Sequence, residues 1–488
     1  MRKLLLPLLA TLMMLAPASA SAATFYLRPD GFIGTSKPWT VVGAPTAWEA
    51  LDDNVTEFQT PSSTDSIEDS LGSRETRVAL ASVNILGVSI TKAQFWYYAG
   101  NNQPVEVKSS LDLSWQTTSS AGWHSVNETI ATQAALNGVF LQFRTQNSST
   151  TPRQIRATFL KIETTGPSLY WGAWMDGDVY KATNPALGDA PWDQTTWNLF
   201  ESHTGKHVSV VHFGQPPPWE QKFSAEPLEK SKARGAFPLM DMGTGFIPGK
   251  PHTEEEPDNR VSLKEINEGV YDSYFKEWAE AVATYKYPFF FRWGWEMNGT
   301  WFKWGKNAAE SPEEFVKAWR RIHNIAAEKG ASNITWVWCP NVEFLGSTPY
   351  SQLYPGDTYV DWTCLDGYNE GGHPFSEVFA SSYSAITKTI APSKPMMIGE
   401  TATINGLGKS SPPYWIENAL QALPATFPKI KAFLWFNWNI FEKGKEWEWP
   451  IEWTSEGQQT FAREIASPYF AADEFGEPTK LAPIQALP

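Results

Sequence analysis

The sequence predicts two domains, an all-β sandwich followed by an α/β (β/α)₈ TIM barrel, and two patterns along the chain lead to this prediction. Between residues 24 and 165, short runs alternate polar and apolar residues and are separated by clusters of Ser, Thr, Pro and Asn, as in the antiparallel strands of a sandwich. Between residues 166 and 488, apolar strand patterns alternate with helical patterns, which is typical of an α/β domain.

The first domain contains strand candidates rich in β-branched and aromatic residues, among them Arg77–Leu80, Ala93–Tyr98 and Val139–Phe143. Its role stays open between carbohydrate binding and a spacer. Five Trp residues could form a platform for glycans or could belong to the core: Trp39, Trp48, Trp96, Trp115 and Trp123.

The second domain contains eight strand candidates, each followed by a helical pattern. They are Leu169–Trp174, His207–Phe213, Ala236–Met242, Pro288–Trp295, Ile334–Cys339, Tyr359–Leu365, Pro395–Gly399 and Ile430–Trp438. Ser311 and Pro312 give one helix a clear start, as N-cap and first helical residue. Eight such units predict a (β/α)₈ barrel. The competing doubly wound sheet would carry a Gly-rich phosphate turn after its first strand, which Gly172–Gly177 does not resemble.

The amino terminus has the pattern of a secretory signal peptide. Arg2 and Lys3 precede an apolar run, Leu4–Ala16, which small residues follow. We therefore expect residues 1–23 to be removed and the protein to be secreted to the extracellular side. No later segment approaches about 18 uninterrupted apolar residues, so no membrane association is expected after removal.

Composition narrows the function classes. The net charge of −14 argues against nucleic acid as a partner. The 25 Trp residues favour a carbohydrate ligand, because an indole packs well on the apolar face of a sugar ring. Cys339 and Cys364 are the two cysteines, either bridged or as buried thiols. No His or Cys spacing indicates a metal site, so no metal and no cofactor are expected, and the protein is expected to be a monomer.

In a barrel of this kind, the active site lies at the carboxyl ends of the strands. Polar residues end the predicted strands there: Asp176, His212 with Gln215, Asp241, Glu296 with Asn298, Asn341, Asp366 with Tyr368 and Asn369, Glu400, and Asn437. Glu296 and Glu400 each close an apolar strand, where an unpaired carboxylate would be costly to bury. Two carboxyl groups facing each other suit glycosidic cleavage, with one as general acid and the other as nucleophile.

The segment RWGWEMNGTWFKWG, Arg292–Gly305, resembles the acid/base segment of glycoside hydrolase family 26, and Met397–Glu400 is similar to the nucleophile strand of that family. The resemblance extends over about residues 169–475. It implies a clan A barrel that acts with retention of configuration, with Glu296 as acid/base and Glu400 as nucleophile.

The same resemblance implies roles for further residues in binding the substrate. Tyr368 would hydrogen-bond the nucleophile, and Trp435 would stack beneath the sugar at the cleaved bond. Trp301 and Trp304 would line the cleft beside Glu296. Trp295 is a departure, since the mannanases of the family usually carry His at this position.

Three residues near the predicted mouth have two interpretations each. His212 could bring an imidazole into the mouth or be a structural histidine. Arg292 points to the same side of its strand as Glu296, as a support that keeps nearby carboxylates charged or as a structural salt bridge. Asn298 could bind a sugar hydroxyl or shape the turn before Gly299.

The resemblance favours an endo-β-1,4-mannanase, and a polysaccharide, chiefly β-mannan, is the expected partner. Because Trp295 departs from the mannanase pattern, a β-1,3-1,4-glucanase, a β-1,3-xylanase or an enzyme for a microbial polysaccharide remains an alternative. Transglycosylation would use the same intermediate. A catalytically silent glycan-binding protein is the alternative from another class, but it would have no need of both Glu296 and Glu400.

Overall fold

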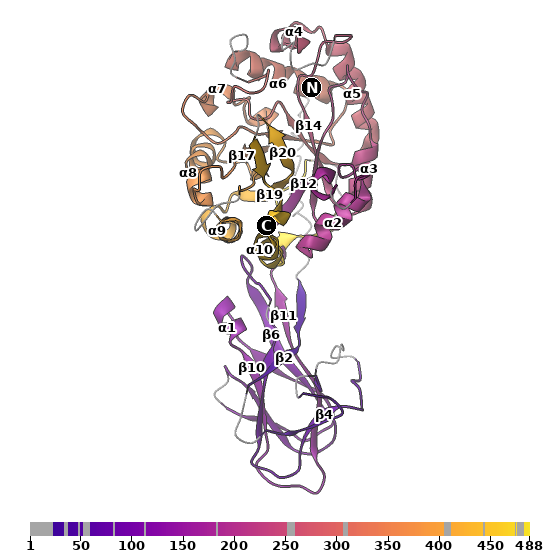
Figure 1. The fold of residues 1–488 in the computed structure, drawn as a ribbon, viewed down its shortest axis with the longest axis vertical. Helices are drawn as coiled ribbons and strands as arrows, with labels where there is room; N and C mark the ends of the chain where they lie inside the picture. Colours follow the sequence, from indigo (N-terminus) through magenta and orange to yellow (C-terminus); the bar gives the residue numbers. More distant parts are fainter. Residues whose placement is uncertain are drawn as a thin grey trace, which may run out of the picture.

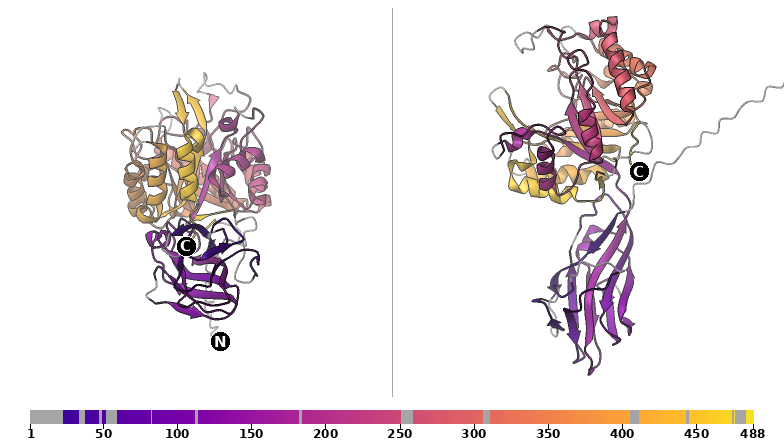
Figure 2. Two further views of the ribbon diagram at one scale, coloured as in Figure 1. Left: turned by 60° about the horizontal axis from the view of Figure 1, so that its bottom comes forward. Right: turned by 90° about the vertical axis from the view of Figure 1, so that its right-hand side faces the viewer.

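The computed structural model describes most of the chain. The described residues are 23–33, 38–46, 49–51, 59–81, 83–111, 114–181, 184–250, 259–305, 311–404, 411–442, 445–473, 475 and 483–488. The predicted signal peptide lies outside them except for residue 23, so its removal stays a prediction. Figure 1 shows a β-rich domain joined end to end to a larger α/β domain, and the views in Figure 2 show the same elongated arrangement.

The amino-terminal domain is a sandwich of two antiparallel sheets, as predicted. One sheet has the order β3 (Thr40–Val42), β4 (Ser66–Asp69), β11 (Arg153–Thr164), β6 (Ile90–Ala99) and β9 (Gly122–Glu128), with β1 (Thr24–Leu27) paired to β11. The other has the order β2 (Pro29–Ile33), β5 (Glu75–Leu80), β10 (Phe140–Arg144), β7 (Val105–Ser109) and β8 (Gln116–Thr118). A short helix, α1 (Gln133–Asn137), precedes β10.

Alternating burial along these strands explains the sandwich. In β6 every second residue of its carboxyl-terminal half is buried, because successive side chains of a strand point to opposite faces. The buried residues Ile67 and Phe95 of the first sheet share one core with Val78 and Leu141 of the second.

The carboxyl-terminal domain is a closed parallel barrel of eight strands, and all eight predicted strands are confirmed to within three residues at either end. The strands are β12 (Leu169–Met175), β13 (Val210–Gly214), β14 (Phe237–Met242), β15 (Phe289–Trp293), β16 (Ile334–Trp338), β17 (Trp362–Asp366), β18 (Met396–Glu400) and β19 (Ile430–Asn437). Pairing of β12 with β13 closes the ring, and β22 (Phe470–Ala471) adds to β12 at its outer side.

Helices surround this ring (Figure 1). They are α2 (Gln194–Thr204), α3 (Glu226–Ala233), α4 (Leu263–Glu268), α5 (Asp272–Tyr285), α6 (Pro312–Glu328), α7 (Tyr350–Leu353), α8 (Phe375–Ala385), α9 (Pro412–Thr426) and α10 (Ser455–Ile465). The predicted start of α6 is confirmed, since Ser311 is its N-cap and forms a capping box with Glu314. A hairpin of β20 (Asn439–Glu442) and β21 (Lys445–Glu448) follows the last barrel strand.

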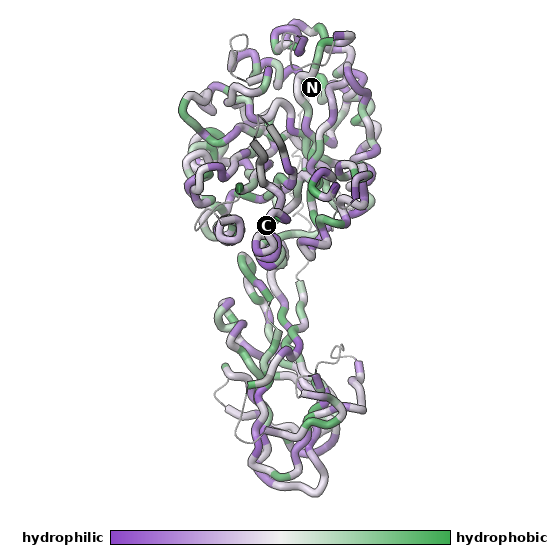
Figure 3. Tube along the Cα trace, in the orientation of Figure 1, coloured by the Kyte–Doolittle hydropathy of each residue, from purple (hydrophilic) through white to green (hydrophobic). Residues whose placement is uncertain are grey.

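The barrel has two apolar layers, and the parity of each strand residue decides to which layer it belongs. In β19, Ala432 and Leu434 belong to the core inside the ring, whereas Phe433 and Trp435 belong to the core between the ring and the helices. Figure 3 shows hydrophobic and hydrophilic stretches along the trace of both domains. Among the described residues, no helix is long and apolar enough to cross a membrane.

The last residues of the chain cover one end of the barrel interior. Ile484 is 5% exposed and Leu487 is 7% exposed, and both pack with the core inside the ring. The backbone of Ile484 accepts a hydrogen bond of 2.8 Å from Trp362 Nε1 and donates one of 2.8 Å to Thr335 Oγ1. The tail is therefore part of the folded barrel.

The variant Ile484→Asp should lower the free energy of unfolding by at least about 2 kcal/mol, because full burial of an Ile side chain contributes about 1.5–3 kcal/mol. Chemical denaturation of the variant and the parent measures the difference. Gln485→Asp is the matched control, since Gln485 is exposed. Equal losses in the two variants would contradict a packing role for Ile484.

Candidate active site

Glu296 follows β15 on a backbone that few residues other than Gly adopt. Its φ is 53°, and Gly294 two residues earlier has φ 55°. The Glu296 N–H donates a hydrogen bond of 2.7 Å to the Cys339 carbonyl, which holds the residue against the end of the next strand. Such a conformation costs on the order of 1–3 kcal/mol and is found mainly at functional sites.

The Glu296 carboxyl group is held by two uncharged donors. Asn341 Nδ2 donates to Oε1 at 2.6 Å, and Trp301 Nε1 donates to Oε2 at 2.6 Å. Burial, and then the negative charge of Glu400, raise the pKa of Glu296 to about 7, and the two hydrogen bonds offset only part of this rise. Glu296 is therefore able to hold a proton near neutral pH.

Glu400, the last residue of β18, has a different environment. Tyr368 donates a hydrogen bond of 2.5 Å to Oε2, and Arg292 donates to Oε1. Burial and the charge of Glu400 raise the pKa of Tyr368 well above its usual value, so the phenol stays protonated and remains a donor. Both oxygens of Glu400 are thus fixed in orientation. The contact between Tyr368 and Glu400 is the one that the sequence resemblance implied.

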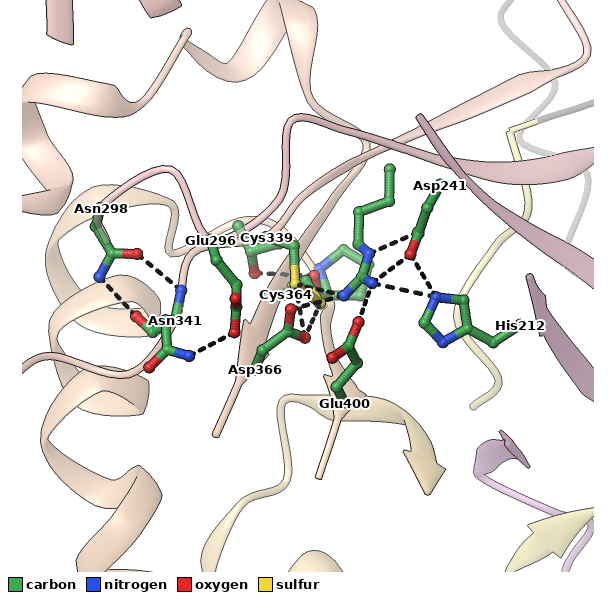
Figure 4. The surroundings of a disulfide bond; sticks show 12 residues. His212, Asp241, Glu296, Asn298, Cys339, Asn341, Cys364, Asp366 and Glu400 are labelled. Atoms are coloured by element: carbon green, nitrogen blue, oxygen red, sulfur yellow. Dashed lines mark hydrogen bonds and ion pairs between the residues drawn. A yellow bond between two sulfur atoms is a disulfide. The ribbon is translucent and has the colours of Figure 1, made fainter. Parts of the chain in front are cut away.

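Arg292 is fully buried beneath the mouth and bonds to carboxyl groups from three other strands, those of Asp241, Asp366 and Glu400. Figure 4 shows these three carboxyl groups close to one another. Its Nε donates to Asp241 Oδ1 at 2.7 Å, and its Nη1 donates to Asp366 Oδ2 at 2.7 Å. Together with the bond to Glu400, this one guanidinium group donates hydrogen bonds to carboxyl groups from β14, β17 and β18. Both interpretations of Arg292 therefore apply, since it forms structural salt bridges and also supports the Glu400 carboxylate. Its side chain is fully buried, so direct contact with a substrate is not expected.

The three carboxyl groups around Arg292 do not have the same proton affinity. Burial raises the pKa of Asp366 well above its usual range, and the charges of Glu400, Glu296 and Asp241 add to this rise, although Arg292 opposes it. Burial acts on Asp241 in the same direction, but the charges of Arg292 and His212 outweigh it and hold the pKa of Asp241 below its usual value. The pKa values of the two aspartates that contact Arg292 are therefore shifted in opposite directions.

Cys339 and Cys364 form a disulfide beneath this network, which settles the alternative left open by the sequence. Cys339 follows β16 and Cys364 lies in β17, so the bond joins neighbouring strands. The Cys339 sulfur lies 3.2 Å from Asp366 Oδ1, a contact without a hydrogen bond since a disulfide carries no S–H. Gly399 leaves room for these groups, because an added Cβ would lie 2.6 Å from the Cys364 sulfur.

Two groups of side chains in the described part of the chain have the composition of a metal site. His212, Asp241 and Glu400 form one group, in which Asp241 and Glu400 are paired with Arg292, while His212 Nδ1 has no hydrogen-bond partner among the described residues. The other group contains both sulfurs of the disulfide. In each group, two of the three side chains are therefore already engaged in another interaction.

His212 and Asn298 are both buried and hydrogen-bonded to other residues of the barrel. His212 is 1% exposed, and its Nε2 lies 2.6 Å from Asp241 Oδ2. Asn298 is fully buried, donates from Nδ2 to the Asn341 carbonyl at 2.9 Å and accepts from the Asn341 N–H at 2.8 Å. The suggestion that Asn298 binds a sugar hydroxyl is therefore wrong. It instead orients Asn341, the residue that contacts Glu296.

Two predictions on Trp residues are wrong. Trp435 is 1% exposed and points from β19 to the helix layer, where it packs on Trp415 and Phe461, so it cannot lie beneath a sugar. Trp304 is 4% exposed, donates to the Trp295 carbonyl and belongs to the core rather than to the wall of a cleft.

Other Trp residues do lie at the mouth. Trp301 is 49% exposed and close to Glu296, as predicted, and its ring lies 5.5 Å from that of Phe344. Trp295 is partly buried, with the Arg292 guanidinium 5.5 Å from its ring centre.

Two further aromatic pairs at this end of the barrel have no motif in the sequence that identifies them. Trp449 stacks on Tyr368 with 4.4 Å between ring centres, and Trp438 stacks on Trp174 at 6.1 Å. Trp449 follows the hairpin after β19, so its position depends on a turn that strand periodicity does not predict. Asn341 was expected at a strand end, but its contact with Glu296 was not.

Gly399→Ala should destabilise the protein by about 1–3 kcal/mol, as overpacking of a filled core does. Its Cβ would meet Cys364 Sγ, Asp366 Oδ1 and Arg292 Nη1 at 2.6, 2.7 and 2.9 Å. Gly188→Ala is the matched control, because the nearest heavy atom to its Cβ would lie at 3.9 Å. Urea denaturation compares them, and an unchanged midpoint for Gly399→Ala would contradict the packing described.

Comparison with known proteins finds relatives of the part of the barrel that carries this site. Residues 260–437 match the family described as glycosyl hydrolase family 26. Endoglucanase H of Acetivibrio thermocellus is 30% identical over 215 residues, which is 42% of this chain and 23% of that protein. Mannan endo-1,4-beta-mannosidase A and B of Caldalkalibacillus mannanilyticus is 28% identical over 161 residues, 31% of this chain and 29% of that protein. The matches thus span less than a third of either relative.

Among solved structures, the catalytic domain of the family 26 endo-beta-1,4-mannanase of Bacillus sp. JAMB-750 aligns with a TM-score of 0.49 and 19% identity, covering 64% of this chain and 89% of that one. The family match begins shortly before α4 and ends with β19, so it contains the strands that carry Arg292, Glu296, Asp366 and Glu400. The segment 260–437, which contains these strands, is therefore similar to glycosyl hydrolase family 26.

Proposed function

We propose that the protein is a secreted glycoside hydrolase that cleaves internal β-linkages of a polysaccharide with retention of configuration, and that β-1,4-mannan is its substrate. The observation that carries the proposal is the contrast between two carboxyl groups at one barrel mouth. Glu296 has neutral donors and a pKa raised to about 7, whereas Glu400 contacts a guanidinium group. Environments that differ in this way are how paired carboxyl groups acquire separate acid and nucleophile roles.

In the first step of the proposed mechanism, the Glu400 carboxylate attacks the anomeric carbon while Glu296 gives its proton to the departing oxygen. Arg292 and Tyr368 hold the two oxygens of Glu400, which limits the orientations the nucleophile can adopt. The bond formed joins Glu400 to the sugar, and the bond broken releases the leaving sugar as an alcohol.

In the second step, Glu296 acts as base, takes a proton from water, and the resulting hydroxide displaces Glu400. Formation of the covalent intermediate removes the negative charge of Glu400. That charge is the second largest contribution to the raised pKa of Glu296, so its loss favours the ionised form of Glu296. The base needed for the second step is thereby produced by the first step.

The names of the relatives point to two substrate classes. The mannosidases favour β-mannan. Endoglucanase H matches this chain over a longer segment than either of these mannosidases, which makes a β-glucan the second candidate. Partly buried Trp295, in place of the His usual in the mannanases, is consistent with a cleft wall that differs from theirs.

Release of reducing ends from glucomannan, galactomannan, mixed-linkage β-glucan and β-1,3-xylan tests the proposal. We expect activity on the mannans, and we expect Glu400→Gln to lower kcat by at least about 10³-fold, since the nucleophile forms the intermediate. Glu343→Gln, an exposed Glu on the loop after β16, is the control and should keep full activity.

Activity on β-glucan alone would reject the mannan assignment and leave the mechanism in place. Full activity of Glu400→Gln on any of the four polysaccharides would reject the mechanism. A folded protein that releases nothing but is retained by one of them would be a glycan-binding protein.

The pH profile provides a separate test of Glu296. Because the general acid must be protonated, kcat/KM should fall as the pH rises through about 7, the pKa to which Glu296 is raised. Trp301 Nε1 stabilises the ionised carboxylate, so Trp301→Phe should raise this pKa further and move the alkaline limb to higher pH. Trp304→Phe is the control, because Trp304 donates to a backbone carbonyl instead. A limb that stays in place in Trp301→Phe would contradict the assignment.

A further inference from the structure

A small polar cavity lies in the amino-terminal domain. Its volume is about 170 Å³, and Glu106, Thr117, Arg144, Gln146 and Arg153 are among the residues that line it. Pockets for drug-sized ligands measure roughly 300–1,000 Å³. This cavity therefore has room for one sugar ring or its substituent, and not for a length of polysaccharide.

Arg153 is the unusual member of the lining. It is the first residue of β11 and is 5% exposed, and its Nε donates to the Pro104 carbonyl at 2.8 Å. Its Nη1 is buried, and no group among the described residues accepts a hydrogen bond from it. A buried charged donor without a partner is costly, so an anion bound in the cavity would supply what the fold does not.

The carboxylate within the cavity does not meet this need. Glu106 Oε2 accepts from Arg144 Nε at 2.7 Å, and its Oε1 accepts from Gln146 Nε2 at 2.8 Å. Both of its oxygens therefore have partners other than Arg153. Since Arg144 balances the charge of Glu106, Arg153 leaves the cavity with a positive charge, in a chain whose net charge is −14.

Asp69, the Cα partner of Arg153 between β4 and β11, has other partners as well. Its two oxygens accept from the backbone N–H groups of Leu71 and Gly72 at 3.0 Å each. Its ion pair is with Arg74, at 3.6 Å. Within the described part of the chain, no ion pair between Asp69 and Arg153 is found.

Trp115 packs against Arg144, one of the residues that line the cavity. The Arg144 guanidinium lies 4.0 Å from the centre of its ring, and Lys108 Nζ lies 5.2 Å from it. Stacking on an indole restricts a guanidinium group. Trp115, one of the five Trp residues expected either as platform or as core, therefore holds Arg144 in position beside Glu106.

We propose that this cavity binds the carboxylate of an acidic sugar, a uronate residue of a glycan, through Arg153. A guanidinium group presents parallel N–H donors that match the two oxygens of a carboxylate. Thr117 and Gln146 offer polar groups at the rim for ring hydroxyls. The site lies in the amino-terminal domain, so this proposal does not depend on the function proposed for the barrel.

Native gel electrophoresis of the full chain in gels that contain polygalacturonate tests the site. The Glu400→Gln background is used, so that loss of hydrolysis and loss of binding are separate results. We expect polygalacturonate to retard the protein, and Arg153→Met to weaken binding about tenfold or more, because a hydrogen bond to a charged group contributes about 1.5–3 kcal/mol. Arg156→Met is the matched control, since Arg156 lies on the same strand but faces away from the buried side.

Thr117→Trp fills the cavity from its exposed rim and provides the test if Arg153→Met does not fold. This variant should abolish retardation. Equal retardation of the Arg153 and Arg156 variants would overturn the proposal, as would equal retardation by neutral glucomannan. Gels that contain dextran sulfate distinguish a carboxylate ligand from a sulfate ester. Retardation by dextran sulfate but not by polygalacturonate would overturn the assignment to a carboxylate.

Discussion

The barrel mouth depends on one buried guanidinium group. Arg292 is fully buried and is bonded to Asp241, Asp366 and Glu400, which come from three different strands. Removing one partner of a buried ion pair typically costs about 3–5 kcal/mol, because the other charge is left uncompensated. Burial raises the pKa of Asp366 well above its usual range, whereas the charges of Arg292 and His212 hold the pKa of Asp241 below its usual value. The Arg292 network therefore fixes the positions of the carboxyl groups next to Glu400 and gives its two aspartates opposite shifts of proton affinity.

The same network explains why the two glutamates differ. Glu400 lies at the end of a strand and receives a hydrogen bond from Arg292. Glu296 itself has a left-handed backbone, two residues after Gly294, and its oxygens accept hydrogen bonds from the neutral donors Asn341 and Trp301. The positive charge is thus placed beside one carboxylate and not beside the other. Because the two side chains are chemically identical, the difference between their surroundings comes from the positions of their backbones.

The elements of the barrel could be predicted from the sequence because strand and helix periodicity is local, and the polar residues that end the strands were found for the same reason. The failures at Trp435 and Trp304 have another cause. Whether a strand residue faces the ring or the helices changes with each step, so the side on which Trp435 lies depends on the exact register of β19. Trp449 and Asn341 depend on loop paths, for which the sequence has no comparable periodic signal.

The departure at Trp295 can be separated from the chemistry of the site. Its ring contacts Phe302 and Trp304, with 4.9 Å between ring centres in both cases, and Trp304 also donates to its backbone carbonyl. The aromatic residues that follow Glu296 therefore support Trp295. The donors that hold the Glu296 carboxyl, Asn341 and Trp301, are independent of that cluster. A substitution at the position of Trp295 can thus change the aromatic surroundings of Glu296 while the two donors that hold its carboxyl group stay in place.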